Sequence, residues 1–133
     1  MPNPTKLPTN VTTGTTGHVD HTNSVHSAVN ALTVVRQSWR TTAYSLTLAD
    51  SGEVVEVSSA DNLVVTVPSN AAVQFPVGTV ILISQYGTGQ VTVTPAAGVT
   101  IRTATSLTTR VRYSEMSLRK RATDEWVASG DLS

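Results

Sequence analysis

The hydrophobic and polar positions of this chain follow two different periods, one before residue 40 and one after residue 44. In the first region, candidate buried side chains recur at alternating steps of three and four residues, which places them on one face of an α-helix. In the second region, apolar and polar side chains alternate in short runs, which is typical of half-buried β-strands. The pattern therefore predicts one short helix followed by a β domain.

The helical pattern spans residues 17–40 and forms an a/d heptad seam. The seam positions are His18, His21, Val25, Ala28, Leu32, Val35 and Trp39. A helix of this length is only marginally stable alone in water, so the seam must be buried. We favour burial between copies of the chain, because Leu at an a position with Val at d lets more than two helices pack. This predicts a stem in which more than two copies associate, with packing against the chain's own β domain as the alternative.

All three histidines lie within nine residues, at the start of this seam. We interpret His18 and His21 as seam residues and His26 as a solvent-exposed side chain. Two histidines three residues apart on one helix face could instead bind zinc or nickel, which is the less favoured interpretation. A catalytic arrangement of Ser24, His26 and Asp20 is disfavoured, because neighbours on one short helix cannot supply a nucleophile, a base, an orienting group and an oxyanion hole together.

Residues 1–16 contain three prolines and six threonines. Proline lacks a backbone donor and disfavours the interior of both helices and sheets. We therefore expect an extended arm that becomes ordered against a partner, with a floppy terminus as the alternative. The arm residues expected to contact that partner are Pro2, Pro4, Lys6, Leu7, Pro8 and Val11.

Residues 44–133 are predicted to form the β domain. The alternation predicts eight or nine short strands, at 44–48, 53–57, 63–67, 79–84, 90–94, 99–102, 110–113, 115–121 and 125–128. Turn residues separate these runs and no helical pattern intervenes, which favours a mainly β fold, an antiparallel β-sandwich or barrel-like knob. Residues 80–83 are continuously apolar and are predicted to form a central strand buried on both faces. Phe75 and Trp126 are the large core candidates, with a subunit contact as the alternative.

The composition argues against several classes of function. The formal net charge is zero and the pI is 6.8, so neither nucleic acid nor a membrane is expected as a partner. Cysteine is absent, which excludes disulfides, thiolate metal sites and a thiol nucleophile. Glu53 and Glu56 are an odd number of residues apart on one predicted strand, so they point to opposite faces instead of facing each other across a cleft. We therefore predict no enzymatic activity, no metal and no cofactor.

Charge is unevenly distributed along the β domain. Residues 50–61 hold four acidic side chains, while residues 102–121 hold six of the nine basic ones. Pairing of these two zones across a sheet, within or between subunits, is the preferred interpretation. The alternative is a basic ligand face for an anionic glycan or a protein, consisting of Arg110, Arg112, Arg119 and Arg121.

Several segments of the β domain carry a family resemblance. They are LTLADSGEVVEV at 46–57, FPVGTVI at 75–81, GQVTV at 89–93, GVTIR at 98–102 and LRKRATDEWVASGDL at 118–132. Together they resemble the small β-domains of tailed-bacteriophage structural proteins over residues 46–132. The predicted helix, with Gly17-His18 and the run 25–32, is similar to helical connectors in such appendages.

The resemblance implies a surface protein of a phage virion, commonly a trimer, with no enzymatic role. The chain has no shaft repeat, so an arm, a short stem and one β-knob favour capsid decoration or a head fibre over a tail fibre. We expect a homotrimer on the capsid exterior whose arms bind the phage major capsid protein and reinforce capsomer contacts. A tail-fibre or minor tail appendage that binds a host receptor or surface glycan is the alternative.

Overall fold

Strand β1 (Gln37–Arg40) occupies the last residues of the segment predicted as a helix. The structure, a computed structural model, describes residues 34–133, of which Arg36–Ser133 form one compact unit. The predicted boundaries are therefore wrong in two respects: the β unit begins at residue 36 instead of 44, and no helix extends to residue 40. The predicted arm and the seam positions up to Leu32 lie outside the described residues.

The other strands lie close to the runs predicted from alternating hydrophobicity. They are β2 (Tyr44–Ser45), β3 (Val54–Val57), β4 (Leu63–Val67), β5 (Val80–Gln85), β6 (Val91–Pro95), β7 (Thr100–Thr103), β8 (Glu115–Ala122) and β9 (Glu125–Gly130). The strand predicted at 110–113 is not formed, because these residues make a turn. A 3-10 helix covers Leu48–Asp50, and no α-helix occurs between residues 34 and 133.

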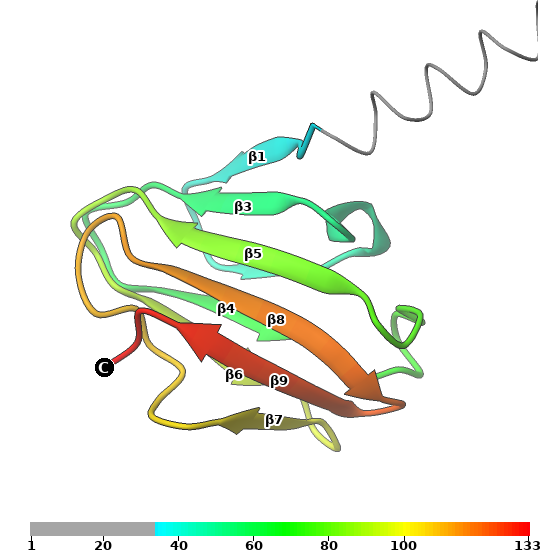
Figure 1. Cartoon of the computed structure of the whole chain (residues 1–133). Helices are drawn as coiled ribbons and strands as arrows, with labels where there is room; N and C mark the ends of the chain where they lie inside the picture. Colours follow the sequence, from blue (N-terminus) through cyan, green and yellow to red (C-terminus); the bar gives the residue numbers. More distant parts are fainter. Residues whose placement is uncertain (1–33) are drawn as a thin grey trace, which may run out of the picture. The chain divides into compact units, whose positions relative to one another are not determined.

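The pairing of the strands overturns the predicted antiparallel sandwich or barrel. One sheet has the order β1-β3-β5-β8-β9-β7, and a second has the order β2-β4-β6. β1, β3 and β5 run parallel in the first sheet, as do β2, β4 and β6 in the second. The chain crosses to the other sheet between successive strands of each parallel set. These strands therefore form three turns of a parallel β-solenoid (Figure 1).

Successive turns of the solenoid are stacked in register. Val54 pairs with Leu82 and Leu63 pairs with Val91, a spacing of 28 residues in both cases (54 to 82 and 63 to 91). Each strand thus pairs with a segment one full turn away instead of with its neighbour in sequence. A local hairpin pattern predicts pairing between consecutive strands. It therefore cannot identify a partner that lies beyond the next strand in the chain.

The arches that connect the two sheets are stacked as well. Gly89 donates its backbone N–H to the carbonyl of Ser59, in the arch one turn earlier, at 2.9 Å. A Cβ atom on Gly89 would lie 1.9 Å from the carbonyl oxygen of Asp61, so only glycine permits this approach. The Gly-Thr-Gly segment at 87–89, which suggests a hairpin turn in the sequence, is therefore a stacked arch between sheets.

Antiparallel pairing occurs in the C-terminal part of the unit. β8 runs antiparallel to both β5 and β9, and β9 is parallel to β7 at the sheet edge. β5 is central in its sheet, as its apolar run predicted. It is not buried on both faces, however, since Val80 is 41% exposed.

The hydrophobic core lies between the two sheets, because alternate side chains of each strand point inward. Parallel stacking places apolar side chains beside each other: Val55 is opposite Ile83 in one sheet, and Val65 is opposite Val93 in the other. The predicted core residues Phe75 and Trp126 are buried, which confirms that prediction. The buried apolar side chains are Leu46, Val55, Val57, Val65, Val67, Phe75, Ile81, Ile83, Val91, Val93, Val99, Met116, Leu118, Trp126 and Ala128.

One buried side chain beside this core is cationic. Lys120 on β8 is 2% exposed, and its ammonium donates to Asn70 Oδ1 at 2.6 Å and to the Phe75 carbonyl at 2.8 Å. Burial of a charge is costly unless the group is hydrogen-bonded, so these contacts are needed to keep the ammonium inside. They also tie β8 to the loop 68–79, which carries Phe75 into the core.

Candidate contact surface

The structure places the four arginines of the predicted ligand face at the two ends of β8. Arg119 and Arg121 are exposed near the end of this strand. Arg110 and Arg112 are exposed in the segment just before its start. Arg119 forms no ion pair with any residue between 34 and 133.

The arginines between residues 102 and 121 that form ion pairs bind acids near the C-terminus. Arg110 binds Asp131 through two hydrogen bonds, of 2.7 and 3.0 Å. Arg102 and Arg121 both bind Glu125, each at 3.0 Å. Hydrogen bonding to Arg110 lowers the pKa of Asp131, and hydrogen bonding to Arg102 lowers the pKa of Glu125.

These pairs differ from the predicted pairing of two charge zones. The acids at 50–61 do not bind the basic residues at 102–121, and the ion pair that involves the acidic zone in the described residues joins Glu53 to Arg36. The prediction of intramolecular pairing between these zones was therefore wrong in its partners. Arg102, Arg110 and Arg121 instead bind Glu125 and Asp131, which follow β8 closely in the chain.

An exposed cluster of three aromatic rings and one guanidinium joins segments that are far apart in sequence. We call it the aromatic patch; it consists of Trp39 on β1, Tyr86 directly after β5, and Arg112 and Tyr113 in the turn before β8. Trp39 and Tyr86 pack edge to face with ring centroids 5.0 Å apart, and Tyr86 and Tyr113 are 5.8 Å apart. The guanidinium carbon of Arg112 lies 4.8 Å from the Tyr113 ring centroid, and its Nε donates to the Tyr86 carbonyl at 2.9 Å.

The rings of the aromatic patch remain open to solvent. Trp39, Tyr86 and Tyr113 are 54%, 44% and 63% exposed. Contiguous exposed apolar surface on a folded unit commonly marks a contact site, and Trp, Tyr and Arg are the side chains that dominate interface energetics. Tyr113 also has a φ of 73°, unlike any other non-glycine residue that the structure describes. Such a backbone is held in place by its surroundings and is enriched at functional sites.

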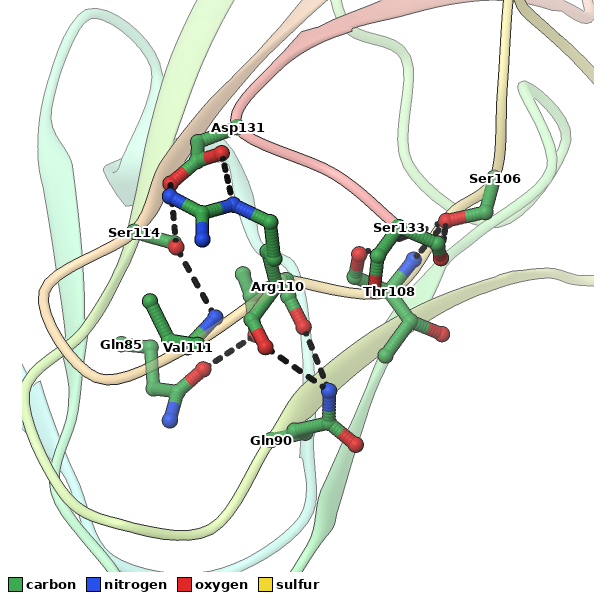
Figure 2. Close-up of polar contacts among 10 residues, drawn as sticks. Gln85, Gln90, Ser106, Thr108, Arg110, Val111, Ser114, Asp131 and Ser133 are labelled. Carbon is green, nitrogen blue, oxygen red and sulfur yellow. Dashed lines mark hydrogen bonds and ion pairs between the residues drawn. The ribbon is translucent and has the colours of Figure 1, made fainter.

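Buried hydrogen bonds hold the turn that carries Arg112 and Tyr113. The Tyr113 N–H donates to the Gln85 carbonyl at 2.6 Å, and the Gln85 N–H donates to the Ser114 carbonyl at 2.9 Å. The Gln85 side chain is fully buried and accepts a bond from the Thr109 hydroxyl at 2.6 Å. Gln90 donates to the carbonyls of Thr109 and Arg110 from the neighbouring arch (Figure 2).

The C-terminal residues close the same turn. The Asp131 carboxylate accepts from Arg110 and, at 2.7 Å, from the Ser114 hydroxyl, which itself accepts from the Val111 N–H at 3.0 Å (Figure 2). We call Arg110, Ser114 and Asp131 the C-terminal clasp. Because the clasp and the buried bonds fix the turn on both sides, the backbone that carries Arg112 and Tyr113 is preorganised, which lowers the ordering cost when a partner binds.

A carboxylate borders the patch at its Trp39 end. In the register of the large sheet Trp39 lies beside Glu56, which belongs to the neighbouring strand. Glu56 forms no ion pair within residues 34–133. Within the patch, Glu56 therefore lies beside Trp39, whereas the Arg112 cation lies over the rings of Tyr86 and Tyr113.

Two of these residues were predicted as functional, although in separate sites. Trp39 was assigned to the last seam position, and Arg112 to the basic ligand face. Tyr86 and Tyr113 were missed. A usable signal was present, because large aromatic side chains are unusual in turns, where small polar residues and glycine predominate.

The other predicted seam and arm positions lie outside the described residues, except Val35, which is exposed and precedes the compact unit. Between residues 34 and 133, no group of three or more histidine, aspartate or glutamate side chains could hold a metal ion. In the same part of the chain, no helix is long and apolar enough to cross a membrane. Comparisons with protein-family models, curated proteins and solved structures found no match.

Proposed function

We propose that this chain is a structural protein of a tailed-bacteriophage virion that decorates the capsid exterior as a homotrimer. The observation that carries the proposal is the aromatic patch. A fixed, exposed group of tryptophan, tyrosine and arginine side chains on a stacked β-solenoid is suited to contact with another macromolecule. The placement on a phage particle rests on the resemblance of the segments at 46–132.

The ionisable groups inside the β unit support a role in binding and not in chemistry. Lys120 is occupied by Asn70 and the Phe75 carbonyl. Asp50, which is 1% exposed, accepts bonds from the Tyr44 hydroxyl and the Thr47 N–H, both at 2.8 Å. Both groups thereby hold loops onto the solenoid, and neither is presented to a bound molecule.

In this proposal, residues 1–16 bind the major capsid protein and the seam positions from His18 to Leu32 join three copies. A short extended arm gives a weak contact by itself. Simultaneous binding of linked arms strengthens attachment by about 10²–10⁴-fold when the geometry allows all of them to engage. The trimer is thus the device that turns a weak arm contact into stable decoration.

The test uses particles of the phage that encodes this chain, prepared without it. Purified full-length protein should be trimeric by light scattering and should bind these particles to saturation. A variant that lacks residues 1–16 should remain trimeric but lose particle binding. A monomeric full-length chain, or undiminished binding by the deletion variant, contradicts the proposal.

A tail appendage that binds a host receptor or surface glycan is a second candidate, and the position of Arg112 favours it. Open aromatic rings beside a guanidinium can stack on a sugar and donate hydrogen bonds to its polar groups. In this case the purified protein adheres to host cells, and Arg112→Ala or Tyr113→Ala reduces adhesion. Arg119→Ala is the matched control, because Arg119 is exposed on β8 outside the patch.

A further inference from the structure

We infer that the aromatic patch is the contact surface between the β units of neighbouring copies in the homotrimer. This inference rests on the proposed trimer and adds to it a second interface, made by residues other than the heptad seam. Its occupant is a second copy of this chain. The supporting observations are the position of Trp39 in the chain, the distribution of charge along the patch and its open rings.

The position of Trp39 connects the patch to the predicted seam. The β unit begins at Arg36, and Trp39 follows three residues later. An extended chain spans 3.3–3.6 Å per residue, so the two Cα atoms lie within about 10 Å of each other. Leu32, the last seam position outside the described residues, is seven residues from Trp39, so copies that are joined through the seam from His18 to Leu32 hold their Trp39 side chains on short tethers.

This proximity changes the affinity that the patch must supply. Two surfaces on short tethers meet at an effective concentration in the millimolar range. A contact that is too weak to form between free copies then forms readily within one oligomer. A few exposed rings are enough under these conditions, although they are too few for a stable dimer of separate β units.

The charges of the patch are suited to contact between copies that are arranged around a threefold axis. The aromatic side chains follow the order Trp39, Tyr86, Tyr113, with Glu56 beside Trp39 and Arg112 over both Tyr86 and Tyr113. In a threefold assembly each copy presents one side of its contact surface to one neighbour and the other side to the next. The side of one copy that carries Arg112 can thus meet the side of its neighbour that carries Glu56, with opposite charges facing each other.

The first experiment measures whether Trp39 is covered in the assembled full-length protein. The chain has two tryptophans, of which Trp126 is buried and Trp39 is 54% exposed in the single copy. Acrylamide quenching of tryptophan fluorescence is measured across a dilution series, together with the mass by light scattering. Trp39→Phe gives the contribution of the buried Trp126 alone.

We expect weak quenching in the trimer, close to that of Trp39→Phe, and strong quenching after dilution into monomers. A trimer in which Trp39 is quenched as freely as in the monomer overturns this inference and leaves the trimer standing. Weak quenching that persists in the monomer also overturns it, because the chain's own residues then cover Trp39. A full-length chain that is monomeric at every concentration overturns both the trimer and this interface.

A second measurement compares variants on different surfaces. Tyr113→Ala should raise the concentration at which half of the trimer dissociates by about tenfold or more, as is typical of a central interface residue. Val64→Ala is the matched control, because Val64 is 42% exposed on β4 in the other sheet, away from the rings of the patch. Equal dissociation of the two variants contradicts the inference.

Discussion

Two aromatic pairs in this molecule have nearly the same geometry and very different surroundings. Phe75 and Trp126 pack edge to face at 5.4 Å with an interplanar angle of 85°, and Trp39 and Tyr86 do so at 5.0 Å and 86°. The first pair is 3% and 1% exposed, whereas the second is 54% and 44% exposed. The contact geometry therefore does not tell a core pair from a surface pair, and the exposed fraction does.

The difference arises from the position of each ring in the fold. Trp126 is at an inward position of β9, and Lys120 holds the loop that brings Phe75 over it. Trp39 is at an outward position of β1, the edge strand of its sheet. Burial of the first pair stabilises the folded chain, while the second pair keeps apolar surface available for a contact outside the single copy.

The largest expected effect is the loss of the buried pair. Trp126→Ala removes the largest buried side chain and leaves a cavity between the sheets. We expect the free energy of unfolding to fall by about 3–5 kcal/mol. Chemical denaturation monitored by circular dichroism measures the change. A loss below about 1 kcal/mol would contradict the assignment of Trp126 to the core.

The next effect concerns the lysine that supports the same pair. Lys120→Ala leaves the Asn70 side chain and the Phe75 carbonyl without their donor and opens a cavity, which should lower the free energy of unfolding by about 2–4 kcal/mol. Lys120→Met is the matched control, because it keeps the aliphatic volume and removes only the ammonium. If both variants are equally destabilised, the effect arises from the hydrogen bonds and not from the packing. If the free energy of unfolding changes in neither variant, the role assigned to Lys120 is wrong.

Loss of the exposed pair should have little effect on the stability of the single copy and should instead weaken the trimer. Trp39→Ala should reduce the free energy of unfolding by about 1 kcal/mol or less in a dilute sample with separated copies, since one exposed aromatic pair contributes about 0.5–1.5 kcal/mol. The same variant should weaken the trimer. A destabilisation as large as that of Trp126→Ala would place Trp39 in the core and remove the distinction between the pairs.

The smallest effect concerns the C-terminal clasp beside the exposed pair. The pKa of Asp131 is held below the ordinary 3.8 by Arg110, so its ionised form is favoured in the folded state. The clasp is therefore fully formed above about pH 4 and is lost as the pH falls through the lowered pKa. The melting temperature should drop across this acidic range.

Asp131→Asn should flatten part of that acidic drop. The remainder should persist, because the pKa of Glu125 is also lowered, by its hydrogen bond to Arg102. Thermal melts of both proteins between about pH 5 and pH 2 measure this difference. If the two curves are parallel throughout, Asp131 is not linked to folding.

Strand positions could be predicted from the sequence more accurately than strand partners. The run at 63–67 matches β4 in both of its ends, and the run at 115–121 matches β8 to within one residue. The failures have identifiable causes. Trp39 continued a helical period by coincidence, and Arg110–Tyr113 alternated like a strand although the buried Gln85 and Thr109 hold that segment as a turn.

Only part of the candidate site could be predicted from the sequence. Trp39 and Arg112 could be selected by their chemistry, but nothing in the sequence placed them in one surface. That juxtaposition requires β1 to lie two strands from β5 in the sheet and the 110–113 turn to fold back onto Gln85. Both are long-range contacts, which local residue patterns do not report.

The sequence by itself determined the positions of most strands between residues 44 and 133 and which of their side chains point inward, although it did not predict β1. This information is local, because the two-residue period of a strand follows from backbone geometry alone. The tertiary structure decided that strands pair in parallel one solenoid turn away, at separations of 17, 21 and 28 residues (37 to 54, 44 to 65, and 54 to 82), and it assembled the aromatic patch from three separate segments. Those outcomes depend on stacked arches such as the one at Gly89, where close backbone approach selects one pairing from several that the same strands allow.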